Sequence, residues 1–543
     1  MLKDTAENLF KQSLENAYPE IYLDVICETP KNPEHGDFSV NIAMQLAKPL
    51  GMPPRKIAEK IIEGLNDDLQ IIEKVEIAGP GFINIKFKND FVAGSLSYII
   101  DLDKEFGRSD IGKSQKVNVE YVSANPTGLL HLGHGRNAVI GDTISNLYEA
   151  LGYDVTREYY FNNAGNQMNN LAKSIFARYN QINTPDFPFP EDGYHGDYIK
   201  LIAEDLKKEY PEGFPGSESE VLELCRLSGE KWCFAKITST LERMKISQDV
   251  FYNEDTLYKD GKIEEVISEF KSLGLAYEKD GALWLKLSEM GLEDDRVIVK
   301  SSGEPTYRLP DIAYHREKFK RGFDILIDVF GADHIATVPD VLAGVKALGY
   351  DSDKVKVLIH QFVSLTENGQ QVKMSKRTGK SYTLDDLLDE VGEDVVRFFL
   401  LMRSIGTHLE FDLSLAREQS DKNPVFYLQY AHARICSVFD KAAELQNIEY
   451  DLSLLNSPEE LNLIKKLHLL PDTIIASANK FEPQILAEYL RETAGLFHAF
   501  YHNHRIIGVD EKLGASRLKL AKATKTVIGN GLRILGINAP ERM

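Results

Sequence analysis

Cysteine is scarce in this chain of 543 residues, which has only four, Cys27, Cys225, Cys233 and Cys436. They are scattered and form no C-x-x-C pair, which argues against both a disulfide framework and a zinc knuckle. Apolar runs long enough to cross a bilayer are missing too, and the opening Met1-Leu2-Lys3-Asp4 does not begin a secretory signal. We therefore expect a cytoplasmic protein that has no membrane partner and no protein-bound metal.

Positive charge is also in short supply. The chain has 63 Lys and Arg against 83 Asp and Glu, which gives a formal net charge of −20 at pH 7. This balance excludes a protein that coats nucleic acid over its whole surface, although RNA binding needs only a local basic track. A hydrophobic content of 43% is ordinary for a globular protein. The length predicts roughly two to four domains.

The stretch Ser123 to Arg136 reads S-A-N-P-T-G-L-L-H-L-G-H-G-R and has the pattern of a strand-to-helix turn. An alternating strand, 117–123, precedes it, and a helix, 133–151, follows. His131 and His134 are three residues apart, so they share a face of the first helical turn, where backbone N–H groups and the helix dipole favour a phosphate chain. Gly133 would let a base or ribose lie against the backbone. Taken alone, the two side chains could equally be surface histidines at a helix start.

A second stretch, K-M-S-K-R at residues 373–377, follows a strand-like run at 355–365. From residue 371 to residue 384 there are four basic residues and no acidic one, which suggests a polyphosphate partner, although a solvated charge run has the same composition. The H-L-G-H element resembles the "HIGH" motif, and K-M-S-K matches the "KMSK" motif, of class I aminoacyl-tRNA synthetases. The resemblance implies catalytic roles for His131, His134, Lys373 and Lys376, and an ATP site made of His131, Gly133, His134, Lys373, Met374, Ser375 and Lys376.

The pattern along the chain predicts an α/β protein with three units. Residues 1–110 read as an α+β domain, and residues 111–385 as a Rossmann-type domain with a parallel sheet and an insertion at about 170–292. Residues 386–543 read as an all-α bundle, with the K-M-S-K loop at the junction. In detail, we expect helices at 2–17, 38–65, 338–348, 384–404, 416–445, 458–480, 483–504 and 514–535, strands at 72–87, 154–160, 325–330 and 355–365, and a hairpin at 276–287.

Two patterns in the last unit are typical of RNA binding. Tyr427, Tyr430 and Arg434 follow one another along a predicted helix, and unpaired bases commonly bind such aromatic and arginine side chains. Lys519, Lys522 and Lys525 form a basic stripe at helical spacing, compatible with a phosphate track. The aromatic residues could instead belong to the core of the bundle.

Tyr307 and Asp311 are four residues apart, so a helix would place an aromatic ring and a carboxylate on one face. A cationic ligand would suit both groups. The alternative is a helix cap beside a core tyrosine, and the pair alone does not decide between the two.

Several longer phrases resemble arginyl-tRNA synthetases of the bacterial type, namely H-G-D-F-S-V-N-I-A-M-Q-L-A-K, A-G-P-G-F-I-N-I-K-F, R-E-Y-Y-F-N-N-A-G-N-Q-M, N-P-V-F-Y-L-Q-Y-A-H-A-R and A-P-E-R-M. The resemblance implies that arginine, ATP with Mg²⁺ and tRNA(Arg) are the substrates of a monomer. It also implies that Tyr307, Asp311 and Glu120 hold the guanidinium, that Asn125 holds the amino group beside His134, and that Phe82 and Asn84 touch the D-loop of the tRNA.

Two other interpretations share the same motifs. One is a nucleotidyltransferase for a small metabolite, against which the large terminal units argue. The other is a catalytically dead RNA-binding paralogue, against which the two intact motifs argue. The sequence leaves open whether Asp333 and His334 touch the ligand.

Overall fold

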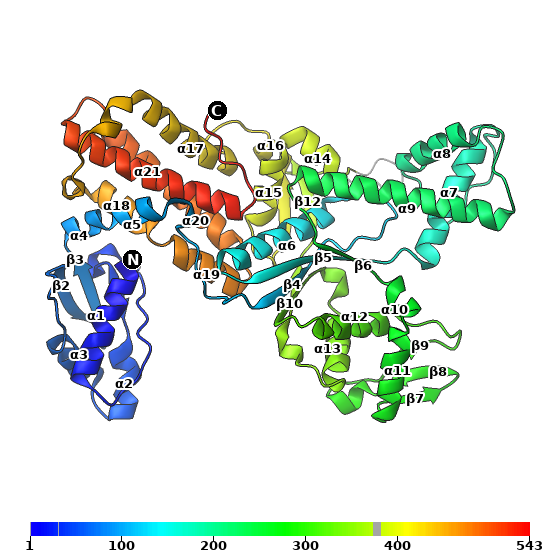
Figure 1. Cartoon of the computed structure of the whole chain (residues 1–543), viewed down its shortest axis with the longest axis horizontal. Coiled ribbons are helices and arrows are strands. Elements are labelled where there is room, and N and C mark those ends of the chain that lie inside the picture. The colour runs from blue at the N-terminus through cyan, green and yellow to red at the C-terminus, as the bar shows by residue number, and fades with distance from the viewer. Residues whose placement is uncertain (1, 31, 373–381) are drawn as a thin grey trace.

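The computed structural model describes residues 2–30, 32–372 and 382–543. Figure 1 shows a small N-terminal unit beneath a helical bundle, a central α/β region, and a helical arm that extends away from both. The N-terminal unit holds a three-stranded antiparallel sheet in the order β1-β3-β2, made of β1 (Phe38–Val40), β2 (Ile72–Ala78) and β3 (Phe82–Phe87). Its helices are α1 (Leu2–Ala17), α2 (Ile42–Leu50) and α3 (Pro54–Glu63), and α4 (Asn89–Gly94) and α5 (Leu96–Leu102) lead onward.

The single helix expected at 38–65 is wrong, because residues 38–40 form β1 and the rest divides into α2 and α3. Gly51 ends α2 in the left-handed conformation with φ of 61°, and Pro53 and Pro54 begin α3. Both features are ordinary helix boundaries. The expected helix at 2–17 is confirmed, and the strands expected at 72–87 are present as the antiparallel pair β2 and β3.

The central sheet has five parallel strands in the order β11-β10-β4-β5-β6. They are β4 (Lys116–Glu120), β5 (Asp154–Phe161), β6 (Val250–Asn253), β10 (Ile325–Gly331) and β11 (Val355–His360). The chain runs outward from β4 to β6 on one side and returns to add β10 and β11 on the other. The strand order therefore reverses beside β4, and in such sheets the ligand crevice lies at the carboxyl ends of the strands at this point.

Two helices cover opposite faces of this sheet near β4. The α6 helix (Leu132–Ala150) packs against Tyr121, because a Cβ placed at Gly141 would lie 2.2 Å from the Tyr121 ring. Side chains alternate along a strand, so Asn118 and Glu120 face the other way, toward α12 (Arg308–Lys320). Both faces of β4 are thus buried, although one of them is polar.

The arm contains α7 (Gly165–Gln181), α8 (Asp197–Glu209) and α9 (Glu218–Arg243), which share a small core of their own. After α9 the chain returns to the central sheet as β6, a strand that the sequence analysis did not predict, and continues through α10 (Asp255–Lys259) and α11 (Lys262–Ser272). The expected hairpin is confirmed as β7 (Ala276–Lys279) and β8 (Ala282–Leu285), joined to β9 (Arg296–Val299). Asp280 and Gly281 turn the hairpin with φ of 54° and 75°, as a tight two-residue turn requires.

The expected single strand at 355–365 is wrong, because β11 ends at His360 and β12 (Val363–Glu367) belongs to a different sheet with β13 (Gln370–Gln371) and β14 (Leu409–Asp412). The chain leaves the parallel sheet at Gln361, whose N–H donates to the carbonyl of Ile405 at 3.1 Å. Between β10 and β11, helix α13 (Val338–Ala347) confirms the expected helix there.

The rest of the described chain is helical, apart from β14, and its main helices are α14 (Leu384–Val391), α15 (Glu393–Leu401), α16 (Leu413–Ala416), α17 (Pro424–Lys441), α18 (Pro458–Leu467), α19 (Leu470–Lys480), α20 (Gln484–Asn503) and α21 (Glu511–Ile534). Two expected helices are each broken in two, the first at Gly392, which has φ of 83°. The helix expected from 416 begins only at Pro424, capped by Asn423. The predicted class, a parallel α/β sheet with a helical C-terminal bundle, is confirmed. None of the described helices is long and apolar enough to span a membrane.

Candidate active site

The two motif histidines cap the start of α6 and stack on each other. Nδ1 of His131 accepts hydrogen bonds from the backbone N–H groups of Gly133 and His134, at 3.1 Å and 3.3 Å. Nδ1 of His134 accepts the N–H of His131 at 3.3 Å, and the two rings lie 3.7 Å apart at 14°. A neutral ring that accepts at Nδ1 carries its proton on Nε2. Each ring therefore carries its single N–H on Nε2, and Nδ1 of His131 satisfies two of the backbone N–H groups that we expected to meet phosphate.

The His134 ring is neutral. Burial, with smaller effects of His131 and His360, lowers the pKa of His134 to about 3. Gly133 leaves room for the neighbouring ring, because a Cβ at this position would lie 3.0 Å from Cε1 of His131. The absence of a side chain at Gly133 therefore allows the two histidine rings to adopt this arrangement.

Arg136, the last residue of the motif, holds α6 in place. Its side chain is fully buried and donates to three backbone carbonyls, those of Gln361 at 2.7 Å, Thr407 at 2.9 Å and Ser404 at 2.9 Å. The Gln361 carbonyl follows β11, and the Ser404 and Thr407 carbonyls precede β14. One side chain therefore connects helix α6 to the segments on either side of the K-M-S-K loop in the sequence. Arg136 is not among the site residues predicted from the sequence.

Asn137 holds the loop after β4 against β10. Its side-chain oxygen accepts the N–H of Val122 at 2.6 Å, and its amide donates to the carbonyl of Val329 at 2.7 Å. Val122 and Ser123 have positive φ values of 70° and 43°, so the backbone makes a sharp turn here. The turn fixes the direction in which the chain leaves the sheet toward His131.

A cluster of three acidic side chains, Asp311, Glu254 and Glu120, lies at the same edge of the sheet, and we call it the acidic pocket. Asp311 is in the first turn of α12, and no described residue donates a hydrogen bond to its carboxylate. Burial, together with the negative charges of Glu120 and Glu254, raises the pKa of Asp311 to about 7, against the opposing effects of His315 and Lys318. The pocket therefore holds a carboxylate that makes no direct ion pair with any described side chain.

Glu254 is a second such carboxylate, and the sequence analysis missed it. It follows β6, is 9% exposed, and accepts hydrogen bonds from the Tyr160 hydroxyl and the Asn162 amide, both at 2.8 Å. Burial raises its pKa as well. A prediction of strand β6 would have placed Glu254 at the carboxyl edge of the sheet, but the strand has only four residues and follows a long helix.

Glu120 already has partners of its own. Its carboxylate accepts from Nζ of Lys318 at 2.6 Å and from the Ser123 hydroxyl at 3.0 Å. Lys318 is completely buried and also donates to Asp328 at 2.6 Å. Glu120 thus belongs to a buried ion network beneath the pocket.

Tyr307 and Asn125 were also predicted to bind arginine, whereas the sequence left open whether Asp333 and His334 touch the ligand. Tyr307 stands at the start of α12 and is 81% exposed. Asn125 accepts the N–H of Asn162 and donates to Gln167, both at 3.0 Å, so it joins the loop after β4 to the start of α7. Asp333 and His334 are exposed at the end of β10, with their side chains 3.7 Å apart. Lys373 and Lys376, which were predicted to be catalytic, and with them Met374 and Ser375, lie outside the described residues.

The residues predicted to bind RNA fall in two other places. Tyr430 is 38% exposed and receives a hydrogen bond at 2.6 Å from Arg434, while Tyr427 packs against His498 at 4.6 Å. The basic stripe on α21 borders a pocket lined by Lys104, Lys522, Lys525 and Arg533, among others, and Lys519 lies over the Tyr450 ring at 4.8 Å. In the N-terminal unit, Phe82 begins β3 and is partly buried, and Asn84 on the same strand is only 4% exposed.

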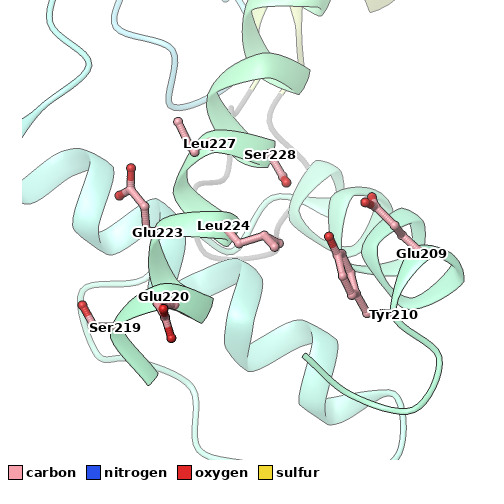
Figure 2. Close-up of a pocket in the computed structure, with 8 residues that line it drawn as sticks. All are labelled: Glu209, Tyr210, Ser219, Glu220, Glu223, Leu224, Leu227 and Ser228. Atoms are coloured by element: carbon pink, nitrogen blue, oxygen red, sulfur yellow. The ribbon is translucent and has the colours of Figure 1, made fainter. Parts of the chain in front are cut away.

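A different pocket lies on the arm, between the end of α8 and the start of α9 (Figure 2). Three glutamates, Glu209, Glu220 and Glu223, line it with Tyr210 and Leu224. None of the described residues that line this pocket is basic.

Models of known protein families match this chain along almost its whole length. The family model of the arginyl tRNA synthetase N-terminal domain matches residues 4–87, that of the class I tRNA synthetase (R) catalytic domain residues 97–399, and that of the DALR anticodon-binding domain residues 428–543. An arginine–tRNA ligase from Desulfotalea psychrophila is 50% identical over 521 residues, covering 95% of this chain and 94% of that protein. One from Salinibacter ruber is 48% identical over 542 residues, covering 96% of each. The Thermus thermophilus arginyl-tRNA synthetase structure shares the fold, with a TM-score of 0.79 at 22% identity over 100% of both chains.

Proposed function

The chain belongs to the arginyl-tRNA synthetase family and is an arginine–tRNA ligase, and we propose that the crevice at the carboxyl ends of β4 and β10 carries out both steps of its reaction. In the first step L-arginine and ATP form arginyl-adenylate. In the second the arginyl group passes to the terminal adenosine of tRNA(Arg).

The observation that carries this assignment is the pair of buried carboxylates without a cationic partner. Asp311 and Glu254 have no ion pair with any described residue, and burial raises the pKa of both. A planar, always charged guanidinium offers several N–H donors in a fixed fork and suits two carboxylates better than an ammonium does. In this proposal the guanidinium lies between Asp311 and Glu254, Tyr307 covers it, and Glu120 adds negative charge from below.

The first step needs no general base. The arginine carboxylate is ionised at neutral pH and attacks the α-phosphorus of ATP, and the bond to the leaving pyrophosphate breaks. Negative charge grows on the phosphate oxygens and on pyrophosphate. His131 and His134 would donate from Nε2, and Lys373 and Lys376 would add positive charge, while Mg²⁺ enters as part of the ATP substrate. Asn125 would hold the amino group of arginine.

In the second step a ribose hydroxyl of the terminal adenosine attacks the carbonyl carbon of the adenylate, and AMP leaves. For binding the tRNA we propose Phe82 and Asn84 in the N-terminal unit and Tyr427, Tyr430, Arg434, Lys519, Lys522 and Lys525 in the bundle. Domain limits of 1–110, 111–385 and 386–543, a monomeric state and a cytoplasmic location are part of the same proposal.

ATP–pyrophosphate exchange, run with each amino acid in turn and with and without tRNA, tests this function. We expect exchange with arginine and with no other amino acid. Exchange that needs no amino acid would favour a small-metabolite nucleotidyltransferase instead.

A further inference from the structure

His315 lies one helical turn after Asp311 on α12 and is 4% exposed. Its Nδ1 is 2.7 Å from the backbone carbonyl oxygen of Asp311, and its Nε2 is 2.8 Å from Oδ2 of Asp328 on β10. The imidazole therefore bridges two parts of the protein. One is the backbone of Asp311, the residue proposed to bind the guanidinium, and the other is the central sheet.

The identity of these two partners decides the charge of the ring. A carbonyl oxygen can only accept, so Nδ1 must carry a proton. The Asp328 carboxylate also accepts from Nζ of Lys318 at its other oxygen, at 2.6 Å. Although burial opposes ionisation, Lys318 and His315 hold the pKa of Asp328 well below its usual range. Asp328 is therefore ionised and accepts from Nε2 as well, so both ring nitrogens are donors.

We infer that His315 is a buried imidazolium and that it is a positioning residue of the arginine pocket, which holds the backbone of Asp311 and keeps its carboxylate ionised. This inference rests on the proposed role of Asp311 in binding the guanidinium. His315 itself touches no substrate and acts through Asp311.

The charges around His315 come from three elements. Asp328 faces it from β10, Glu120 from β4, and Asp311 and Lys318 from α12 itself. Carboxylates on the neighbouring helices form ion pairs with other residues. On α11, Glu265 and Glu269 pair with Arg316, and on α13, Asp340 pairs with Arg308. Burial works against protonation of His315, but Asp328 and the Asp311 carbonyl outweigh it, and the pKa of His315 lies above its ordinary value.

The consequence for Asp311 follows from the sign of the charge. The positive ring lowers the pKa of Asp311, against the burial that raises it. Removing this charge should leave a larger fraction of Asp311 protonated at neutral pH, and a protonated carboxyl binds a guanidinium poorly.

The test compares wild-type protein with His315→Gln and with His468→Gln, a variant of another buried histidine, which lies in the bundle and contacts Ser95. The KM for arginine and the KM for ATP are measured from about pH 6 to about pH 9. In His315→Gln the pH below which arginine binding weakens should rise by about one pH unit, while the KM for ATP and the behaviour of His468→Gln stay as in wild type. A KM for arginine that rises equally at every pH, without this shift, would overturn the inference.

A spectroscopic measurement covers the case in which the variant does not fold. In wild-type protein labelled with ¹⁵N at its histidine rings, His315 should show two protonated nitrogens throughout this range, whereas burial lowers the pKa of His468 to about 3, so that ring should stay neutral. The absence of a histidine that stays doubly protonated to the alkaline end would overturn the inference. The variant Asp311→Asn tests the proposed arginine pocket separately from the role of His315. An unchanged KM for arginine in this variant would refute the pocket.

Discussion

Arg397 and Asp142 form a buried ion pair, 2.5 Å long, that joins α15 to the middle of α6. The same guanidinium donates to the carbonyl of Met244 at 2.7 Å, just after α9, and to that of Leu535 at 3.0 Å, just after α21. One side chain thus holds together the histidine helix, the base of the arm and the end of the C-terminal bundle. Gly536 is in the left-handed region with φ of 71°, and a Cβ there would collide with this guanidinium.

Arg397→Met should destabilise the protein strongly. The change leaves Asp142 as a buried charge without its partner and removes the donor from two carbonyls, and breaking such a pair typically costs about 3–5 kcal/mol. Urea unfolding of the variant measures this cost. Arg403→Met, at an exposed position, is the control and should unfold close to wild type. Equal midpoints for both variants would show that the pair contributes little.

Arginine binding should weaken as the pH falls below about 7. The pKa of Asp311 is raised to about 7, so its carboxylate is ionised above this value and becomes protonated below it. The guanidinium stays charged throughout, so only the pocket changes. The KM for arginine between about pH 5.5 and about pH 8.5 measures the effect.

Glu254→Gln provides the matched variant for this pH dependence. The negative charge of Glu254 raises the pKa of Asp311, so removing that charge should move the acid limb to lower pH. The same change removes a proposed ligand and should therefore also raise the KM for arginine at high pH. A KM that is flat with pH in wild type would contradict the pocket.

His134→Ala should slow adenylate formation and leave tRNA affinity nearly unchanged. The variant loses an Nε2–H donor and the hydrogen bond to the N–H of His131. Removing one transition-state donor typically costs about 2.7–4 kcal/mol. Single-turnover adenylate formation gives the rate, and a wild-type rate would refute the role. Since the pKa of His134 is about 3, this residue should add no acid limb to the rate near neutral pH.

The basic stripe on α21 should control the salt dependence of tRNA binding. Converting Lys519, Lys522 and Lys525 to Ala should weaken binding and flatten the slope of log affinity against log salt, because fewer counterions are released. The matched control converts Lys200, Lys207 and Lys208 on α8, a helix of the arm. If both triple variants change the slope equally, the stripe has no specific role.

The histidine site was predictable because its signals are local. The strand, the turn with Pro126 and Gly128, and the spacing of His131 and His134 all lie within one short stretch, and the structure places the two histidines together at the start of α6. The hairpin at Asp280 and Gly281 was predictable for the same reason.

The pocket formed by Asp311, Glu254 and Glu120 was only half predictable, because its members come from elements far apart in the sequence. Asp311 was predicted from its helical spacing to Tyr307. Glu254 follows a four-residue strand that has no recognisable sequence pattern. The alternation of Val117, Asn118, Val119 and Glu120 is typical of a half-exposed strand, but both faces are buried, since Lys318 from a distant helix neutralises Glu120. Long-range ion pairs of this kind leave no trace in local periodicity.

The central claim, that Asp311 and Glu254 select a guanidinium by its charge, is tested most directly by comparing arginine with citrulline, its neutral analogue of the same shape. The measurement is kcat/KM for ATP–pyrophosphate exchange with each amino acid, in the presence of tRNA, for wild type and for Asp311→Asn. Wild type should prefer arginine by roughly 10⁴ or more, because citrulline leaves the buried carboxylates without a cation. Asp311→Asn should lose most of this preference, chiefly through weaker use of arginine. An unchanged ratio in the variant would contradict the account.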